Sequence, residues 1–148
     1  MRIYFNTSAL NRPLDNLSSG RVRLEAEAVV SLLAAVESGR VDWVGSAYLE
    51  FEVEQDADGE RVRRVRSLLG LVRARVPASD AVAARARALE GMGFRGLDAL
   101  HVASAEAGDA EMLVTTDDRM IRQAARAGLD LRVRLVTPQE AVPLVSRR

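Results

Sequence analysis

The chain has 148 residues, of which 48% are hydrophobic, and its 21 basic and 21 acidic residues give a net charge of zero. This size and composition predict a single globular domain over residues 1–148, and the balanced charge excludes a global basic field for nucleic acid. With no cysteine and one histidine, the chain has no disulfide or thiolate metal site and is unsuited to zinc, so a metal would need the oxygen ligands that Mg²⁺ and Mn²⁺ take. No apolar run reaches the roughly 20 residues that span a bilayer and no signal pattern opens the chain, so we expect no membrane association and a cytoplasmic location.

The chain opens with a short strand that ends in a polar cluster. Residues 3–5 form a β-favouring apolar run, and Asn6, Thr7 and Ser8 follow directly. This pattern is typical of the first strand of an open α/β sheet, in which ligands bind at the carboxyl ends of the strands. A metal site at that tip calls for a carboxylate, whereas Asn6 is a neutral amide.

Strands and helices alternate along the rest of the chain. Apolar spacing predicts further strands over 41–45, 112–115 and 131–136, the last with alternating arginines that suit a sheet edge. Helices are predicted over 21–38, 46–53, 60–73, 79–91, 96–107 and 117–127, with a short last one from 137, an extended link at 76–77 and a frayed tail at 145–148. This alternation predicts an α/β protein with three α/β/α layers and a central, mostly parallel sheet of four to five strands.

Four polar side chains fall near the carboxyl end of a strand or near the start of the helix after it: Asn6, Glu52, Asp98 and Asp117. Carboxylates from distant positions repel one another unless a cation such as Mg²⁺ or Mn²⁺ neutralises them, and a bound cation can activate water for attack on a phosphate. Taken singly, each acid is also a good helix cap or surface residue. The spacing therefore leaves both a metal site and a purely structural role open.

Four segments, in order, resemble the PIN domain: N-T-S-A-L (6–10), S-A-Y-L-E-F-E (46–52), L-D-A-L-H-V-A-S-A (97–105) and L-V-T-T-D-D (113–118). PIN domains are Mg²⁺/Mn²⁺-dependent ribonucleases, and many small ones are VapC-like toxins of type II toxin–antitoxin pairs. The resemblance implies catalytic and metal-binding roles at Asn6, Glu52, Asp98 and Asp117, with Glu50 the less favoured choice for the second acid. It also implies that three hydroxyl residues lie beside the cofactor: Thr7, Ser8 and Thr115.

The resemblance further implies metal-assisted phosphodiester hydrolysis, an RNA substrate, a cognate antitoxin and a homodimer. Arg12 and Arg119 could bind phosphates or form surface ion pairs. His101 falls on the same helical face as Asp98, where we expect it to hydrogen-bond an acid or pack in the wall. The apolar strips of helices 21–38 and 60–73 could face a partner or simply face the sheet.

Asn6 departs from the family pattern, which has an acid at this position. An amide oxygen can coordinate a hard cation but brings no charge, so we expect activity to be reduced or abolished. Asn6 is either natural to this chain or was introduced to silence a nuclease. The alternative function is a non-catalytic PIN-like module that binds protein or RNA. Phosphoryl transfer of the haloacid dehalogenase type ranks last, because it needs aspartates where Asn6 and Ser8 stand.

Overall fold

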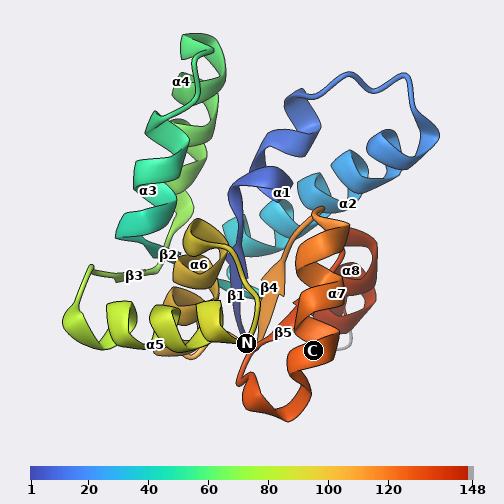
Figure 1. Cartoon of the computed structure of the whole chain (residues 1–148). Coiled ribbons are helices and arrows are strands. Elements are labelled where there is room, and N and C mark those ends of the chain that lie inside the picture. The colour runs from blue at the N-terminus through green and yellow to red at the C-terminus, as the bar shows by residue number, and fades with distance from the viewer. Residues whose placement is uncertain (147–148) are drawn as a thin grey trace.

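A five-stranded, wholly parallel sheet forms the centre of the computed structural model, which describes residues 1–146 (Figure 1). Its strands lie in the order β3-β2-β1-β4-β5 and comprise β1 (Arg2–Phe5), β2 (Asp42–Ser46), β3 (Ala74–Val76), β4 (Met112–Val114) and β5 (Arg134–Val136). The first strand of the sequence is thus the central one, with Ile3 in register with Trp43 on one side and Met112 on the other. Because every strand runs the same way, all five carboxyl ends meet at one edge.

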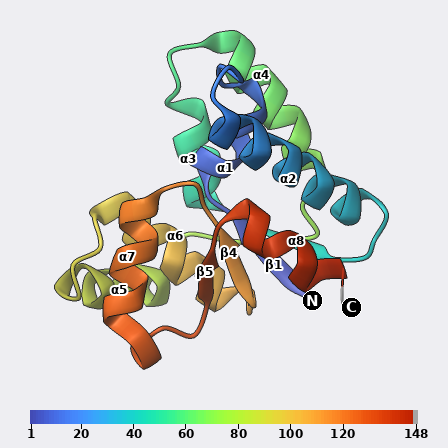
Figure 2. The ribbon, with the colours of Figure 1, turned by 90° about the vertical axis from the view of Figure 1, so that its right-hand side faces the viewer.

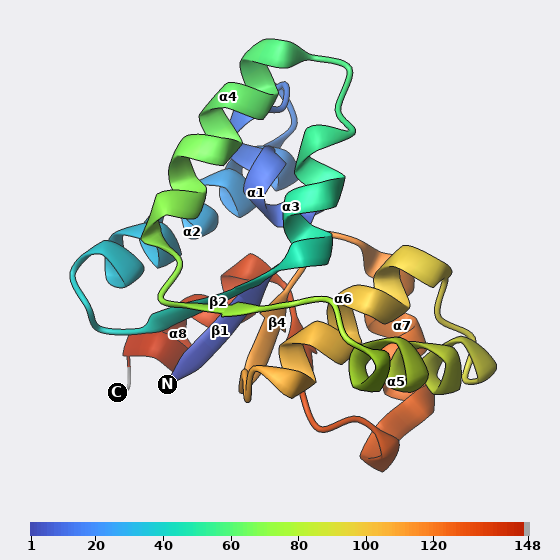
Figure 3. The ribbon, with the colours of Figure 1, turned by 90° about the vertical axis from the view of Figure 1, so that its left-hand side faces the viewer.

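Helices cover both faces of the sheet and complete three layers. On one face α2 (Gly20–Glu37) packs against α8 (Pro138–Ser146), and on the other lie α5 (Asp80–Gly91), α6 (Gly96–Ala107) and α7 (Asp118–Ala127) (Figure 2). The remaining helices, α1 (Thr7–Asn11), α3 (Ala47–Glu54) and α4 (Gly59–Leu68), rise beyond the carboxyl ends of the strands (Figure 3). Short 3₁₀ turns follow three of the helices: η1 (Arg12–Leu14), η2 (Leu69–Leu71) and η3 (Gly128–Asp130). None of the described helices is both long and apolar enough to cross a membrane.

The core lies between the sheet and its two helical layers. Ile3, Tyr4 and Phe5 of β1 are all completely buried, as expected for a strand covered on both faces. The rings of Phe5 and Trp43 meet edge to face with centroids 5.2 Å apart, which ties β1 to β2. The central strand is therefore held firmly from both sides, and so is the polar cluster that follows it.

The predicted fold class is confirmed, while several boundaries were wrong. Of the extended link predicted at 76–77, only Val76 belongs to a fifth strand, β3. Just before β3, the Arg73 N–H donates to the Trp43 carbonyl of β2 at 2.9 Å. The helix predicted over 60–73 ends at Leu68. Residues 145–146 are not frayed, because α8 runs to Ser146 and buries Val145; 147–148 lie outside the described residues.

Candidate functional site

Asn6 stands at the carboxyl end of β1 and is almost completely buried. Its Oδ1 accepts hydrogen bonds from the Ser8 backbone N–H at 2.9 Å and the Ser8 hydroxyl at 2.6 Å, which makes Asn6 the N-cap of α1. The Ser8 Oγ in turn lies 3.3 Å from Thr115 Oγ1 and accepts the Thr116 N–H at 3.2 Å. The tips of the adjacent strands β1 and β4 are thus joined through hydroxyl groups.

Asp117 follows β4 and begins α7. Its Oδ1 accepts the backbone N–H groups of Arg119 at 3.0 Å and Met120 at 3.3 Å, so it caps the helix. Its own N–H bonds Thr115 Oγ1 at 3.1 Å. The capping role that the sequence left open is real, and it holds the carboxylate at the same edge as Asn6.

Glu52 comes from α3 and is held by a histidine from α6. His101 Nε2 lies 3.0 Å from Glu52 Oε1, and His101 Nδ1 lies 2.7 Å from the Tyr4 hydroxyl. The Tyr4 hydroxyl also lies 2.7 Å from Ser46 Oγ. Burial acts to raise the pKa of Glu52, but the hydrogen bond and charge of His101, helped by Thr7, outweigh it and lower the pKa below the ordinary glutamate value.

Asp98 lies in the first turn of α6 and is partly buried. Burial raises the pKa of its carboxyl above the ordinary aspartate value, and the charge of Asp117 raises it further. Glu52 adds a smaller repulsion, which His101 and Arg95 oppose. Carboxylates from α3, α6 and the end of β4 therefore interact electrostatically, although 46 sequence positions separate Asp98 from Glu52 (98 minus 52).

The donor chemistry of this edge fits a hard divalent cation. The candidate ligands are all oxygens, and the repulsion that raises the pKa of Asp98 is one that a cation would relieve. Thr7 Oγ1 is buried near Glu52 without a hydrogen bond of normal length and angle. Within residues 1–146, however, no three acidic or histidine side chains are grouped closely enough to hold an ion as they stand. The acids lie at one edge of the sheet, but in this structure they do not form a complete coordination site.

Three other candidates from the sequence have different surroundings. Glu50 is exposed and makes two hydrogen bonds with Arg75, at 2.7 and 3.0 Å, so Glu52 is the acid of α3 that pairs with α6. The Arg12 guanidinium lies 3.0 Å from Asp15 and 3.2 Å from the buried Glu25, which leaves it little freedom to bind a phosphate.

Arg119 remains available at the surface. It has no ion pair among the described residues, and with Arg95, Arg126 and Asp98 it lines a pocket of about 240 Å³ between α6 and α7. Of the four predicted ligand positions, Asp98 alone lines this pocket. Its arginines give it a positively charged wall beside one carboxylate, a chemistry that suits a phosphate group.

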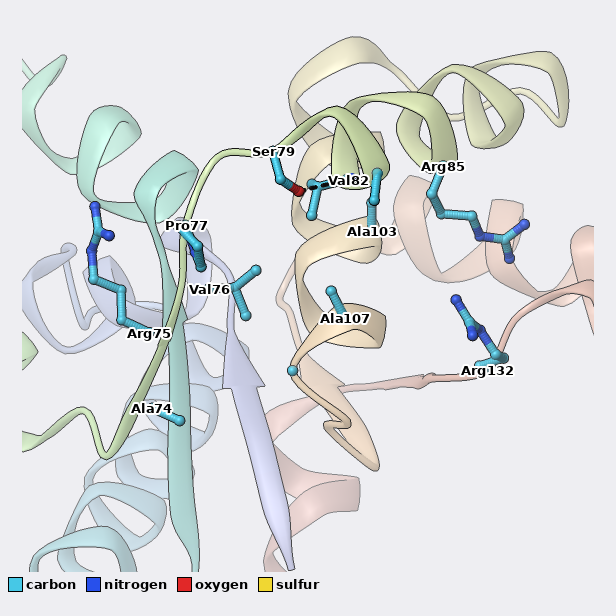
Figure 4. A pocket seen from close by; sticks show the side chains of 12 residues that line it. Ala74, Arg75, Val76, Pro77, Ser79, Val82, Arg85, Ala103, Ala107 and Arg132 are labelled. Carbon is cyan, nitrogen blue, oxygen red and sulfur yellow. Dashed lines mark hydrogen bonds between the residues drawn. The ribbon is translucent and has the colours of Figure 1, made fainter.

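A larger pocket of about 420 Å³ lies elsewhere, between β3, α5 and α6 (Figure 4). None of the four predicted ligand positions lines it. Arg85 and Arg132 lie together at one end of it with their guanidinium groups turned toward each other, and the buried Glu106 pairs with both of them. This pocket is therefore separate from the candidate site.

Sequence reasoning missed the partners behind His101. In the sequence, Tyr4 falls in the apolar run of residues 3–5 and Ser46 at the start of the helix predicted over 46–53, and neither pattern predicts a contact with His101. The available signal was a tyrosine in a strand that must be buried, since a buried hydroxyl needs a hydrogen-bond partner and the chain has one histidine.

Comparisons with known proteins bear on the family and the fold of the chain. A sequence model of the PIN domain matches residues 3–127, a span that includes all four predicted ligand positions. VapBC2 from Rickettsia felis, bound to a DNA fragment from their promoter, is similar in structure with a TM-score of 0.56 and 15% identity, over 93% of this chain and 98% of that chain. VapBC-1 from nontypeable Haemophilus influenzae has a TM-score of 0.59 and 12% identity, over 94% and 99%. No curated protein matches in sequence.

Proposed function

This chain belongs to the PIN domain family, and from that premise we propose that it is a metal-dependent ribonuclease of the VapC-like toxin kind, weakened or silenced by Asn6. The observation that carries the proposal is that three separate elements bring Glu52, Asp98 and Asp117 to one edge of the sheet, where the charges of Asp117 and Glu52 add to burial in raising the pKa of Asp98. Such an arrangement is unfavourable for folding alone and useful for binding a cation.

In this proposal Glu52, Asp98 and Asp117 hold Mg²⁺ or Mn²⁺, with Asn6 as a neutral fourth ligand. When bound there, such an ion would supply an activated water and offset negative charge on a phosphate under attack. The chain's own contribution is to orient the ligands: Asp117 through its helix cap, and Asn6 through Ser8. Arg119 binds the RNA backbone beside the acids.

An asparagine instead of an aspartate at position 6 changes the charge of the site but has little effect on the fold. Asparagine and aspartate cap helices about equally well, so either residue supports α1. The missing negative charge, by contrast, costs a few kcal/mol of cation affinity or transition-state stabilisation, roughly a hundredfold in rate. Restoring the acid should therefore change chemistry without changing structure.

The test is RNA cleavage by the Asn6→Asp variant in the presence of Mn²⁺. We expect cleavage to rise by roughly a hundredfold or more over the unaltered chain. The matched control is the double variant Asn6→Asp with Asp98→Asn, which restores one charge and removes another, and should stay inactive. Absence of any metal-dependent gain would show that Asn6 is not what limits the chain.

The alternative is a non-catalytic PIN-like module that binds protein or RNA. Asn6 and the zero net charge favour it. Calorimetric titration separates the two functions: if neither the chain nor its Asn6→Asp variant binds Mn²⁺, the nuclease is excluded and the binding module stands.

We further propose a cytoplasmic protein of one domain, residues 1–148, that forms a homodimer and binds a cognate antitoxin. Support for one domain comes from β1 at the centre of the sheet and from the packing of α2 on α8, which join early and late parts of the chain. Support for a protein partner comes from an apolar cleft of about 400 Å³ between α1, α2 and α4, where Val30 is half exposed.

A further inference from the structure

His101 is the only histidine of the chain and is completely buried. Its two ring nitrogens have different partners: Nε2 lies 3.0 Å from the Glu52 carboxylate, and Nδ1 lies 2.7 Å from the Tyr4 hydroxyl. The contacts continue to Ser46, whose Oγ lies 2.7 Å from the Tyr4 hydroxyl and accepts the Leu49 N–H at 3.0 Å. A continuous hydrogen-bonded chain thus runs from the N-cap of α3 through the core to Glu52.

The proton positions in this chain are restricted. The Tyr4 hydroxyl has one hydrogen, which it can donate either to Ser46 Oγ or to His101 Nδ1, each 2.7 Å away. The Glu52 side chain presents Oε1 as an acceptor 3.0 Å from His101 Nε2. An unprotonated Nε2 would place a lone pair against that carboxylate. In the neutral imidazole, Nδ1 accepts the Tyr4 hydrogen and Nε2 carries the ring hydrogen; in the imidazolium, both nitrogens carry one. In either form Nε2 therefore donates a hydrogen to Glu52.

We propose that Ser46, Tyr4 and His101 form a positioning relay that fixes the Glu52 carboxylate in advance for cation binding. The inference rests on the proposed function, because it gives the relay a purpose at the metal site. A glutamate side chain has several rotatable bonds, and ordering it has an entropic cost that prior fixation removes from the binding step. Residues behind a metal ligand commonly act in this way.

The relay spans four elements that the fold brings together. Tyr4 comes from β1, Ser46 from the end of β2, Glu52 from α3 and His101 from α6. A merely structural role for His101 would require only that its nitrogens be satisfied. A positioning role requires that the hydrogen bond from Nε2 fixes the position of the Glu52 carboxylate. Experiments can separate the two roles.

The first experiment is an NMR measurement on the full chain with isotope-labelled histidine, which yields a single imidazole without assignment. At neutral pH we expect a hydrogen on Nε2, and we expect its resonance to move when Glu52→Gln replaces the charged acceptor with a neutral one. A ring with no hydrogen on Nε2, or a resonance indifferent to Glu52→Gln, would overturn the relay whether or not the chain cleaves RNA.

The second experiment measures Mn²⁺ affinity by calorimetry in the Asn6→Asp background, with thermal unfolding recorded for every variant. His101→Gln keeps an N–H donor near the place of Nε2, whereas His101→Asn keeps only a group near Nδ1. We expect the asparagine variant to weaken Mn²⁺ binding by about 10- to 100-fold, and the glutamine variant to restore most of that loss. Tyr4→Phe should weaken binding less, and should have no further effect when combined with His101→Asn.

The matched control is Ser104→Ala, a buried residue of the same helix whose hydroxyl makes no hydrogen bond. It should leave Mn²⁺ affinity unchanged. If His101→Gln and His101→Asn lose affinity equally, in step with unfolding temperature, the positioning role fails while the proposed function survives. If the Asn6→Asp chain itself binds no Mn²⁺, both fail together.

Discussion

Glu106 illustrates how a single carboxylate is accommodated inside this protein. Its side chain is completely buried near the end of α6 and accepts two hydrogen bonds from Arg85, Nε–H at 2.7 Å and Nη2–H at 3.1 Å. It also accepts the Arg132 backbone N–H at 2.8 Å. Glu50 makes a similar two-bond contact with Arg75 at the surface. The two pairs share their geometry and differ in burial, which makes them a matched test.

We expect Arg85→Ala to lower the free energy of unfolding by about 3 kcal/mol, because it leaves the Glu106 charge buried without its main partner. Arg75→Ala should cost less than about 1 kcal/mol, since its pair is exposed to solvent. Equilibrium unfolding in urea measures both. Equal losses in the two variants would contradict the role assigned to burial.

Single acids also show where sequence reasoning stops. Asp117 was open as either a cap or a ligand, and the structure makes it a cap that also repels Asp98. The expectation that His101 bonds an acid agrees with its contact to Glu52. Which acid it bonds could not be read from the chain, since the two residues are 49 positions apart.

The helix α7 depends on Asp117 for its first turn, and this structural role can be separated from the proposed chemistry. Asp117→Asn keeps the cap and should leave the free energy of unfolding within about 0.5 kcal/mol, whereas Asp117→Ala loses the cap and should cost about 1 kcal/mol. In the Asn6→Asp background both should weaken Mn²⁺ binding. Unchanged Mn²⁺ affinity in Asp117→Asn would remove Asp117 from the proposed ligand set.

Among the elements, those with strong local signals were predicted closely. The helix expected over 96–107 coincides with α6, and that over 21–38 differs from α2 by one residue at each end. Apolar periodicity and terminal glycines depend only on residues close together in the sequence, so the sequence alone is enough to recognise them. The strand β3 was missed because three residues, Ala74–Val76, have no periodicity. They become a strand only because β2 offers backbone partners in register.

For the whole molecule we expect a homodimer, seen in light scattering at micromolar concentration as twice the 16.1 kDa chain mass. Val30→Glu should weaken it, because this half-exposed side chain lines the apolar cleft between α2 and α4. Leu129→Glu is the control, since Leu129 is fully exposed on η3 and lines no part of that cleft. A monomer at micromolar concentration would contradict the dimer.

The sequence by itself determined the alternation of strands and helices, the fold class and the polar tip at Asn6, because these depend on neighbours along the chain. Only the tertiary structure decided that the charges of Asp117 and Glu52 act on Asp98, and that Arg12 forms an ion pair with Glu25. The same holds for the buried chain of hydrogen bonds that ends on Glu52. These contacts join distant segments, and parallel strands bring such segments together only through long helical crossovers. The sequence thus places Asn6 at the tip of a strand, and the fold places Glu52, Asp98 and Asp117 at the same edge of the sheet.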